Sequence, residues 1–274
     1  MERNTIAILG TGTMGRALAL GLLRSGEAQP DELVGTTRHA ERAQLASEEL
    51  GIPVHIDNPK AAREADIVLL CVKPHTVCKV VTELAREGAL DHDPVLVSIA
   101  AGVSSRRLEK AAGRRVRVVR AMPNTPCLVS AGMTVLCAGK HAGEEELESA
   151  ERVFRSLGRV LRLDEEHIDA VTGLSASGPA FVYVIIESLA EGGVMMGLPR
   201  KVATELAAQA VAGAAQMVLE TDRHPAELKD QVTTPAGCTI SALLSLEDGR
   251  LRSVLARGVQ AAAQSARDLG PPAD

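Results

Sequence analysis

The stretch that most constrains the fold is residues 5–26, "TIAILGTGTMGRALALGLLRSG", because it combines three kinds of local structure in a fixed order. The apolar run TIAILG predicts a strand, and MGRALALGLLRSG predicts a helix that ends at Gly26. The turn between them places Gly10, Gly12 and Gly15 in the spacing G-x-G-x-x-G. A strand, such a turn and a helix form the opening unit of a dinucleotide-binding domain.

Each glycine of this turn has its own physical reason. Gly10 permits the tight turn, Gly12 lets the backbone approach a pyrophosphate, and Gly15 lets the helix pack closely on the strand. The free N–H groups at the start of the helix would then hold the diphosphate. The alternative is a glycine-rich turn without a ligand. The position of the motif between a strand and a helix favours the nucleotide.

The pattern of residues 5–165 extends this unit into a whole sheet. Short Val/Ile/Leu runs, among them ADIVLLCVKP, DPVLVSIAAG and RRVRVVRAMP, alternate with helical segments such as HTVCKVVTELAREG. Runs of this kind are typical of strands that are buried on both faces of a parallel sheet. The alternation predicts an α/β fold with a Rossmann-type doubly wound sheet in residues 1–165.

The pattern changes after about residue 166. The three long segments that follow are helical and show no strand alternation, so residues 166–274 are expected to form an all-helical domain. They are rich in alanine and glycine, which let helices approach closely. They also carry more apolar surface than about 110 residues can cover. We therefore expect a partner chain and a role in dimerisation.

Composition excludes several classes of partner. The 274 residues carry a formal net charge of −5 without a basic stripe, so no nucleic-acid partner is expected. No uninterrupted apolar run is long enough for a membrane span. The five cysteines are dispersed and form no C-x-x-C pair, so neither a disulfide framework nor a metal site is expected. The N-terminal residues show no signal-peptide pattern, which predicts a cytoplasmic protein. The last residues, GPPAD, are expected to be disordered.

The end of the second predicted strand indicates which nucleotide binds. An acidic residue there would accept hydrogen bonds from a ribose 2′-hydroxyl and select NAD(H). This chain instead has Thr36, Thr37 and Arg38, with no carboxylate before Glu41. Hydroxyl donors beside a guanidinium suit a 2′-phosphate, so NADP(H) is the preferred cofactor and NAD(H) a less favoured one. In the alternative interpretation, this is a solvated helix start that Thr37 caps.

Five further motifs resemble one family. CVKPH (71–75), SIAAGVS (98–104), RAMPNTPCLVSAGMT (120–134), AVTGLSASGPAF (170–181) and DQVTTPAGCTISALLSLEDG (230–249) occur in this order. Together they resemble pyrroline-5-carboxylate reductase. The resemblance implies an NAD(P)H-dependent imine reductase that converts L-1-pyrroline-5-carboxylate to L-proline. It further implies a Rossmann domain followed by a helical dimerisation domain, an active site shared between two chains, and dimers that in this family often assemble into decamers.

The resemblance also assigns residues to roles. The cofactor-binding residues it implies are Gly10, Thr11, Gly12, Thr13, Met14, Thr37, Arg38, Asn58, Val72, Lys73, Pro74, Ala100, Ala101 and Gly102. The substrate-binding residues it implies are Thr234, Gly237, Cys238 and Thr239. Two positions depart from the family pattern, since Ala176 and Ala236 stand where the family commonly has glycine. If residue 236 needs a positive φ angle, alanine costs about 1 kcal/mol there.

The chemistry of a cyclic imine with a carboxylate explains the loop at residues 234–239. It precedes a predicted helix, whose N-terminal N–H groups can hold a carboxylate. We expect the Thr239 hydroxyl to bond the ring nitrogen and to orient it for hydride transfer. From the residues alone, Thr234 and Thr239 could equally be helix caps.

Other side chains have weaker assignments. Lys73 follows a buried strand, and we expect it to face the cofactor cleft and take part in catalysis; a solvated strand-end lysine is equally consistent with its position. Ser175 and Ser177 lie where a long helix is predicted to start, and they either contact the substrate or cap that helix. Asn124, in MPNTP beyond a strand end, is a second-tier ligand contact.

Two other functions fit parts of this sequence. One is a related imine reductase or a β-hydroxyacid dehydrogenase with the same two-domain plan. The dehydrogenases usually depend on a lysine in the central helix, which is absent between Ser175 and Gly193. The other is a catalytically idle nucleotide-binding protein, which an altered substrate loop would favour.

Overall fold

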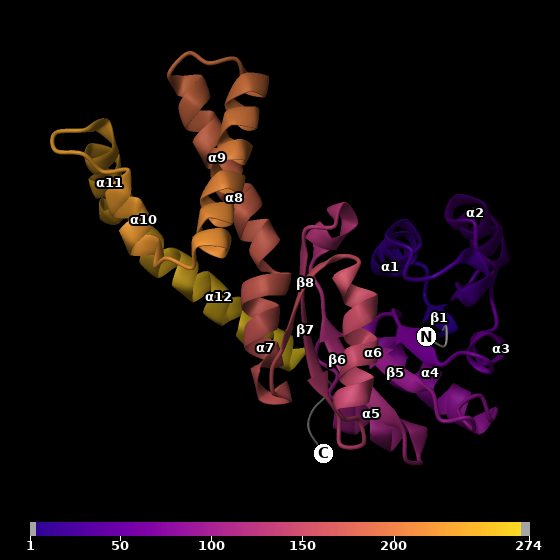
Figure 1. The fold of residues 1–274 in the computed structure, drawn as a ribbon. Coiled ribbons are helices and arrows are strands. Elements are labelled where there is room, and N and C mark those ends of the chain that lie inside the picture. Colours follow the sequence, from indigo (N-terminus) through magenta and orange to yellow (C-terminus); the bar gives the residue numbers. More distant parts are fainter. Residues whose placement is uncertain (1–3, 270–274) are drawn as a thin grey trace. The chain divides into compact units, whose positions relative to one another are not determined.

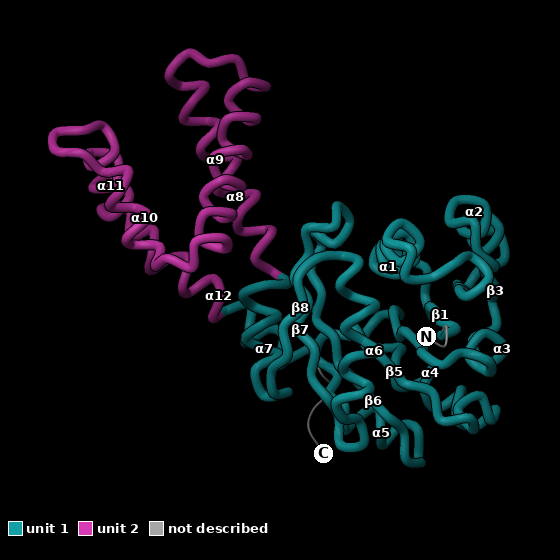
Figure 2. Tube along the Cα trace, viewed as in Figure 1, with its two compact units in different colours: residues 1–176, 261–274 teal, residues 177–260 magenta. Residues whose placement is uncertain are grey.

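The computed structural model describes residues 4–269, which form two compact units (Figures 1 and 2). The chain up to Ala176 and from Ala261 onward belongs to unit 1, and Ser177–Gln260 form unit 2. The GPPAD segment lies outside the described residues. The boundary expected at residue 165 follows the end of the strand-like pattern, whereas the packing contacts divide the chain about ten residues later.

Unit 1 is built on an eight-stranded sheet with the strand order β3-β2-β1-β4-β5-β6-β7-β8. Its strands are β1 (Ile6–Leu9), β2 (Leu33–Thr36), β3 (Val54–His55), β4 (Ile67–Leu70), β5 (Val95–Ser98), β6 (Arg117–Met122), β7 (Gly132–Ala138) and β8 (Gly158–Arg162). The first six strands are parallel, as the buried apolar runs predict. This order reverses between β1 and β4, which is the arrangement of a Rossmann fold.

The last two strands run in the opposite direction. β7 pairs antiparallel with β6, and β8 pairs parallel with β7. A parallel partner for β6 would require a long crossover, usually a helix. The chain between β6 and β7 contains only the short 3-10 helix η2 (Thr125–Val129). The expected parallel sheet is therefore correct for β1–β6 and wrong for its far edge.

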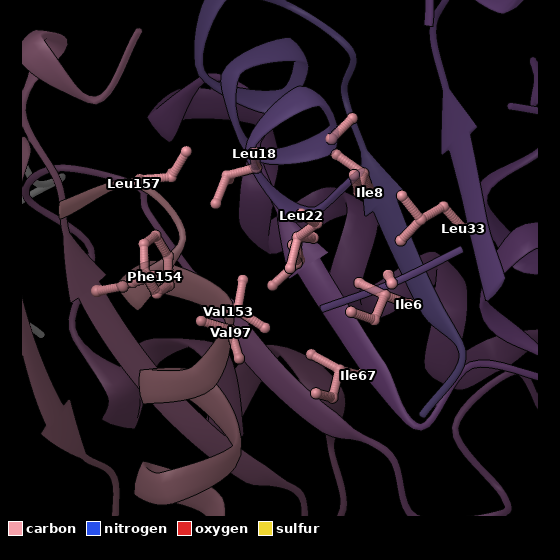
Figure 3. Close-up of a cluster of buried hydrophobic side chains, with 14 of the residues drawn as sticks. Ile6, Ile8, Leu18, Leu22, Leu33, Ile67, Val97, Val153, Phe154 and Leu157 are labelled. Atoms are coloured by element: carbon pink, nitrogen blue, oxygen red, sulfur yellow. The ribbon is translucent and has the colours of Figure 1, made fainter. Parts of the chain in front are cut away.

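Helices cover both faces of the sheet. In β1, Ile6 and Ile8 belong to one core cluster, which also contains side chains of α1 (Thr13–Ser25), α2 (Ala40–Leu50) and α6 (Glu144–Arg155). Ala7 and Leu9 point into the other cluster with α3 (Asn58–Ala62), α4 (Pro74–Arg86) and α5 (Ser105–Ala112). Figure 3 shows the first cluster, in which Phe154 is fully buried among aliphatic side chains. Each such side chain contributes about 1.5–3 kcal/mol through burial.

A polar cluster joins the segment after β8 to this layered core. The Glu165 carboxylate, in the 3-10 helix η3 (Glu165–His167), accepts hydrogen bonds from the Ser105 N–H at 2.7 Å and the Ser105 hydroxyl at 2.5 Å. It also pairs with Arg120 Nη1 at 2.8 Å. Burial acts to raise the pKa of Glu165, but the Ser105 and Arg120 hydrogen bonds outweigh it and lower that pKa. Glu165 thus fixes the start of α5 and the buried Arg120 at once.

The helix expected from residue 167 onward is interrupted. It begins as α7 (Ile168–Val171), widens into a π-helical segment, η4 (Thr172–Ala176), and bends at Ser177 before α8 (Gly178–Met195) begins. The sequence GLSASGP supplies the physical reason. Its glycines and serines favour the helix weakly, and Pro179 cannot donate the backbone hydrogen bond that would continue the turn.

Unit 2 is helical throughout its described length. After α8 come α9 (Arg200–Thr221), α10 (Pro225–Gln231), α11 (Cys238–Asp248) and the first part of α12 (Leu251–Asp268). α8 and α9 pack through a small cluster in which Ala190, Ala203 and Ala207 are buried. Large apolar side chains remain outside, and Met195 and Met196 are 86% and 85% exposed. Exposed apolar area of this extent marks an interaction surface.

Two helical stretches meet the length and hydropathy of a membrane span, although none was expected. They are Glu165–Met195 and Arg200–Thr221, each with a mean hydropathy of 1.3, and only 22% and 11% of their apolar windows are buried. Neither stretch contains an uninterrupted apolar run of that length, and both reach this mean hydropathy with interspersed small and charged residues. Length and composition alone are weak evidence for a span, because helices that pack against a partner chain have the same character.

Candidate nucleotide and substrate sites

A cleft of about 660 Å3 opens at the carboxyl ends of the strands in unit 1. It lies at the switch point between β1 and β4, where ligands bind in open α/β sheets. Of the residues that the sequence assigns to the cofactor, this cleft is lined by Gly10, Thr11, Gly12, Thr13, Thr37, Arg38, Asn58, Val72 and Lys73. The fold therefore brings together side chains that come from four separate parts of the chain.

The glycine-rich loop has the shape that a diphosphate requires. Gly10 has a φ of +102°, and a Cβ there would lie 3.0 Å from the Cys71 carbonyl oxygen. A Cβ on Gly15 would lie 2.2 Å from the Gly10 carbonyl oxygen, so α1 packs directly on the turn. At Gly12, by contrast, a Cβ would meet no described atom within 4 Å. Gly12 thus borders open space in the cleft, and a ligand can approach its backbone there.

The N-terminus of α1 is free to bind an anion. Its N-cap residue is Gly12, which has no side chain to satisfy the first N–H groups, and the first turn carries no acidic residue. The loop itself is fixed by β2, because the Gly10 and Thr11 N–H groups donate to the Thr36 carbonyl oxygen at 3.1 and 2.8 Å. Free N–H groups and the helix dipole together form an anion site.

Positive charge gathers at the end of β2. Arg38 and Arg42 both line the cleft, and neither guanidinium forms an ion pair within residues 4–269. The N-cap of α2 is His39, so the alternative role of Thr37 as the cap of that helix is wrong. Sequence reasoning missed several further lining residues, among them the polar side chains Arg16, His39, Arg42 and Thr76. The position of Arg42 one turn into the predicted helix was the signal for it.

The β4 end supplies the opposite wall. Val72 and Lys73 line the cleft, and Lys73 is the N-cap of α4 with an exposed side chain. Burial raises the pKa of the neighbouring Cys71 thiol to about 12, which keeps it protonated and unreactive at neutral pH. The other assigned cofactor residues lie outside this lining: Met14, Pro74, Ala100, Ala101 and Gly102. Their roles remain predictions.

The loop before α11 in unit 2 is a tight turn. The Gly237 N–H donates to the Thr234 carbonyl oxygen at 3.0 Å, with Pro235 and Ala236 between them. Ala236 has a φ of +57°, so this position has the left-handed conformation that favours glycine. A Cβ on Gly237 would lie 2.5 Å from Thr234 Oγ1 and 3.0 Å from the Thr234 carbonyl oxygen, so a larger residue would crowd the turn. A type II turn favours proline at its second position and needs a positive φ angle at its third, which are the positions of Pro235 and Ala236.

The turn leads directly into the N-terminus of α11. Gly237 is its N-cap and offers no side-chain cap, so neither Thr234 nor Thr239 caps this helix. Thr239 is half-buried in the first helical turn, while Thr234 and Cys238 are exposed. Ser177 is the N-cap of α8 without a capping hydrogen bond, and Ser175 lies in the π-helical segment of unit 1. The substrate roles of these residues remain predictions.

The sheet order, the glycine loop and the guanidinium-lined cleft define a class of protein, the dinucleotide-binding oxidoreductases with a Rossmann domain. Two family models match the chain. Residues 5–102 match "NADP oxidoreductase coenzyme F420-dependent", and residues 165–269 match "pyrroline-5-carboxylate reductase dimerisation". The second match covers the helices that leave large apolar side chains exposed.

Individual relatives match over nearly the whole chain. The pyrroline-5-carboxylate reductase of Methanosarcina acetivorans is 41% identical over 98% of this chain and 99% of its own. The pyrroline-5-carboxylate reductase of Glycine max is 42% identical over 98% of this chain and 97% of its own. The solved structure of a pyrroline-5-carboxylate reductase from Coxiella burnetii has a TM-score of 0.91 and 35% sequence identity. The match covers 99% of this chain and 100% of that one. The chain therefore belongs to the pyrroline-5-carboxylate reductase family.

A second solved structure bears on the cofactor. The Plasmodium falciparum pyrroline carboxylate reductase, solved with NADP bound, is 30% identical and has a TM-score of 0.88 over 99% of this chain and 100% of its own. The prephenate dehydrogenase of Aquifex aeolicus, at 17% identity and a TM-score of 0.56, shares the fold alone.

Proposed function

We propose that this chain reduces L-1-pyrroline-5-carboxylate to L-proline with NADPH, the last step of proline biosynthesis. The observation that carries the proposal is that one chain of this family combines an anion-binding, guanidinium-lined nucleotide cleft with an uncapped helix N-terminus behind the TTPAGCT turn. The first feature suits a dinucleotide with a 2′-phosphate, and the second suits a small carboxylate.

The cleft residues fit NADP(H). The open space at Gly12 and the free N–H groups of α1 would receive the diphosphate, and Arg38, Arg42 and Thr37 the 2′-phosphate. Asn58 would contact the adenosine ribose. When bound, the reduced nicotinamide supplies a hydride for the imine carbon. We assign Ala100, Ala101 and Gly102, which follow β5, to the nicotinamide end, and Lys73 to the wall beside it.

The substrate loop would bind and orient the imine. The N-terminal N–H groups of α11 hold the carboxylate without a cationic side chain. The Thr239 hydroxyl oxygen accepts a hydrogen bond from the protonated ring nitrogen, which directs the ring carbon toward the donor. Because the iminium is a far better hydride acceptor than the neutral imine, holding that proton on nitrogen lowers the barrier. We also assign Thr234, Gly237, Cys238, Ser175 and Ser177 to substrate binding.

Assembly follows from the same family membership. The match to a dimerisation model and the exposed apolar helices support a homo-oligomer. We propose that residues 166–274 form the substrate-binding and dimerisation domain, that the active site is shared between two chains, and that dimers assemble further into a decamer. Helices covered by a partner chain would account for the apolar character of α8 and α9 without a membrane, consistent with a cytoplasmic enzyme.

The test is a steady-state assay that follows loss of the reduced nicotinamide absorbance with pyrroline-5-carboxylate, run with NADPH and NADH. We expect turnover with NADPH and a loss of about 100-fold in kcat/KM for Thr239→Ala, since one transition-state hydrogen bond contributes this much. Ser245→Ala removes an exposed hydroxyl from the same helix and serves as the matched control. NADPH binding without turnover would instead identify an idle nucleotide-binding protein.

A further inference from the structure

A side chain in the β6–β7 connection contacts the segment that carries Ser175. Asn124 is half-buried and is the second residue after β6, and its two amide atoms have different partners. Its Oδ1 accepts the Met133 N–H at 2.9 Å, and its Nδ2 donates to the Ser175 carbonyl oxygen at 3.3 Å. The amide therefore joins β7 to the π-helical segment η4. Its oxygen and one of its N–H groups thus bind other atoms of the protein, whereas the sequence predicts that Asn124 contacts a ligand.

The Ser175 carbonyl lacks its usual helical hydrogen-bond donor, and the sequence explains why. In an α-helix, the carbonyl of residue 175 accepts a hydrogen bond from the N–H of residue 179. Residue 179 is proline, which has no N–H. The donor for a π-helical bond would be the Ala180 N–H, but this group donates to the Ser177 carbonyl oxygen at 3.0 Å. Neither helical donor is available, and Asn124 Nδ2 takes their place.

The Ser175 hydroxyl is left free by this arrangement. Within residues 4–269 it makes no hydrogen bond, although the residue is half-buried. Its direction is set by the backbone of η4, and π-helical turns are frequent at functional sites because they turn a side chain away from the regular helical direction. The contact that holds this backbone therefore also sets where the hydroxyl points.

We propose that Asn124 is a positioning residue for the imine substrate. Its amide replaces the backbone donor that Pro179 removes, and it thereby fixes the η4 backbone so that Ser175 presents its hydroxyl to the substrate. The inference rests on the proposed reductase function for its kinetic consequence. Its structural half, the hold of Asn124 on η4, can be tested independently.

Asn124→Asp is the sharpest variant. The aspartate keeps an oxygen to accept the Met133 N–H, but it places a second oxygen against the Ser175 carbonyl in place of the N–H. We expect a decrease of about 10- to 100-fold in kcat/KM for the imine, the range that a displaced positioning group produces. The change should be expressed mainly in KM for the imine. The affinity for NADPH should stay within about twofold, because the glycine loop is not involved.

A double variant tests the specific role. Pro179→Ala restores an N–H at residue 179, so Asn124→Asp/Pro179→Ala should regain much of the activity that Asn124→Asp loses. Thr125→Ala, which truncates the exposed neighbour of Asn124, is the matched control and should behave as wild type. No rescue in the double variant, or equal losses of imine turnover and NADPH affinity, would overturn the proposal in favour of general destabilisation.

Hydrogen exchange on the same proteins separates the two proposals. Asn124→Asp should accelerate amide exchange in residues 172–178, and the added Pro179→Ala should slow it again. If the wild type reduces no imine but this exchange pattern is observed, the proposed reaction is wrong, while the stabilisation of the η4 backbone by Asn124 is supported. Unchanged exchange in Asn124→Asp would reject the proposed contact even in an active enzyme.

Discussion

The Thr36 hydroxyl donates a hydrogen bond to Asn58 Oδ1 at 2.6 Å, and its oxygen accepts the Gly10 N–H at 3.2 Å. One side chain at the end of β2 thus connects the glycine loop to the residue assigned to the adenosine ribose. Thr36 is 1% exposed, so this connection is shielded from water. Because the Thr36 hydroxyl donates its proton to Asn58, it is not the phosphate donor that the sequence suggested; it instead holds the two halves of the nucleotide cleft in register.

Replacing Thr36 with valine should therefore weaken NADPH binding without a direct contact being removed. Valine has the same shape and cannot make either hydrogen bond, and each lost bond contributes about 0.5–1.5 kcal/mol. We expect a Kd for NADPH that is raised about 5- to 30-fold, measured by the fluorescence of the bound nucleotide. Thr82→Val removes a hydroxyl that donates to the Ala111 carbonyl oxygen outside the cleft lining, and it provides the comparison. An unchanged Kd in Thr36→Val would show that Asn58 holds its position alone.

Gly12→Ala should weaken NADPH binding without destabilising the fold. The added methyl group meets no described atom within 4 Å, so the free energy of unfolding of the apoprotein should change by less than about 0.5 kcal/mol. The same methyl group occupies the space proposed for the diphosphate, and NADPH binding should fall at least about 100-fold. Gly15→Ala is the reverse case, because its Cβ would lie 2.2 Å from the Gly10 carbonyl oxygen and should destabilise the fold itself. Calorimetric titration and thermal unfolding measure the two effects.

Arg38→Ala should change the cofactor preference. A guanidinium that binds a 2′-phosphate contributes to NADPH and not to NADH, so the ratio of the two kcat/KM values should fall by about 10- to 100-fold, as expected for a charge-assisted bidentate contact. The preference for NADPH that remains should depend on Arg42, so the double variant Arg38→Ala/Arg42→Ala should show a still lower ratio of the two kcat/KM values. Arg24→Ala, at the far end of α1, is the control. An equal loss with both nucleotides would place Arg38 outside the phosphate site.

Ala236→Gly should relieve strain in the substrate turn. An alanine at φ +57° costs about 1–2 kcal/mol, while the unfolded chain gains about 0.4–1 kcal/mol of conformational entropy when glycine replaces it. The variant should be as stable as the wild type or up to about 1 kcal/mol more stable. Ala242→Gly, within α11, should instead lose about 1 kcal/mol. Thermal unfolding at equal protein concentration compares them, and equal losses in both would contradict a left-handed residue 236.

Glu165→Gln should destabilise the protein in a pH-dependent way. The folded-state pKa of Glu165 is lowered from its ordinary value of 4.5, so its contribution is complete above that value and is lost as the pH falls through the folded-state pKa. At neutral pH the variant should lose about 2–3 kcal/mol, because Arg120 stays buried without its partner and Glu165 is partly exposed. The difference from wild type should shrink in acid. Glu166→Gln, on a 78% exposed neighbour, should show neither effect.

Much of the nucleotide domain could be predicted from the sequence because its signals are local. The apolar runs, the glycine spacing and the missing acid after Thr36 each lie within a few residues, and they predict the strands β1, β2, β4, β5 and β6, the loop and the cofactor type. The two residues of β3 were too short for any periodicity to reveal. The reversed direction of β7 was also missed, because it depends on the length of a connection rather than on the strand itself.

The remaining features depend on contacts between distant residues. Nothing local shows that the Asn124 amide meets Ser175, that Glu165 meets Ser105 and Arg120, or that Thr36 meets Asn58. These are polar pairs more than twenty residues apart, and their partners follow from the completed fold. Position 236 was the exception. The departure from a family glycine raised the question of a positive φ angle there, and Ala236 has a φ of +57°.

The exposed apolar helices of unit 2 have a consequence for the abundance of the enzyme in a cell. The described α8 and α9 bury three alanines between them, too little apolar area to hold these helices without a second chain. Their folding is then a bimolecular event, and the fraction folded rises with the total amount of chain. Dilution would act on this protein as a denaturant does on others. At concentrations near the dissociation constant of the assembly, a twofold fall in synthesis would reduce the amount of active enzyme by more than half.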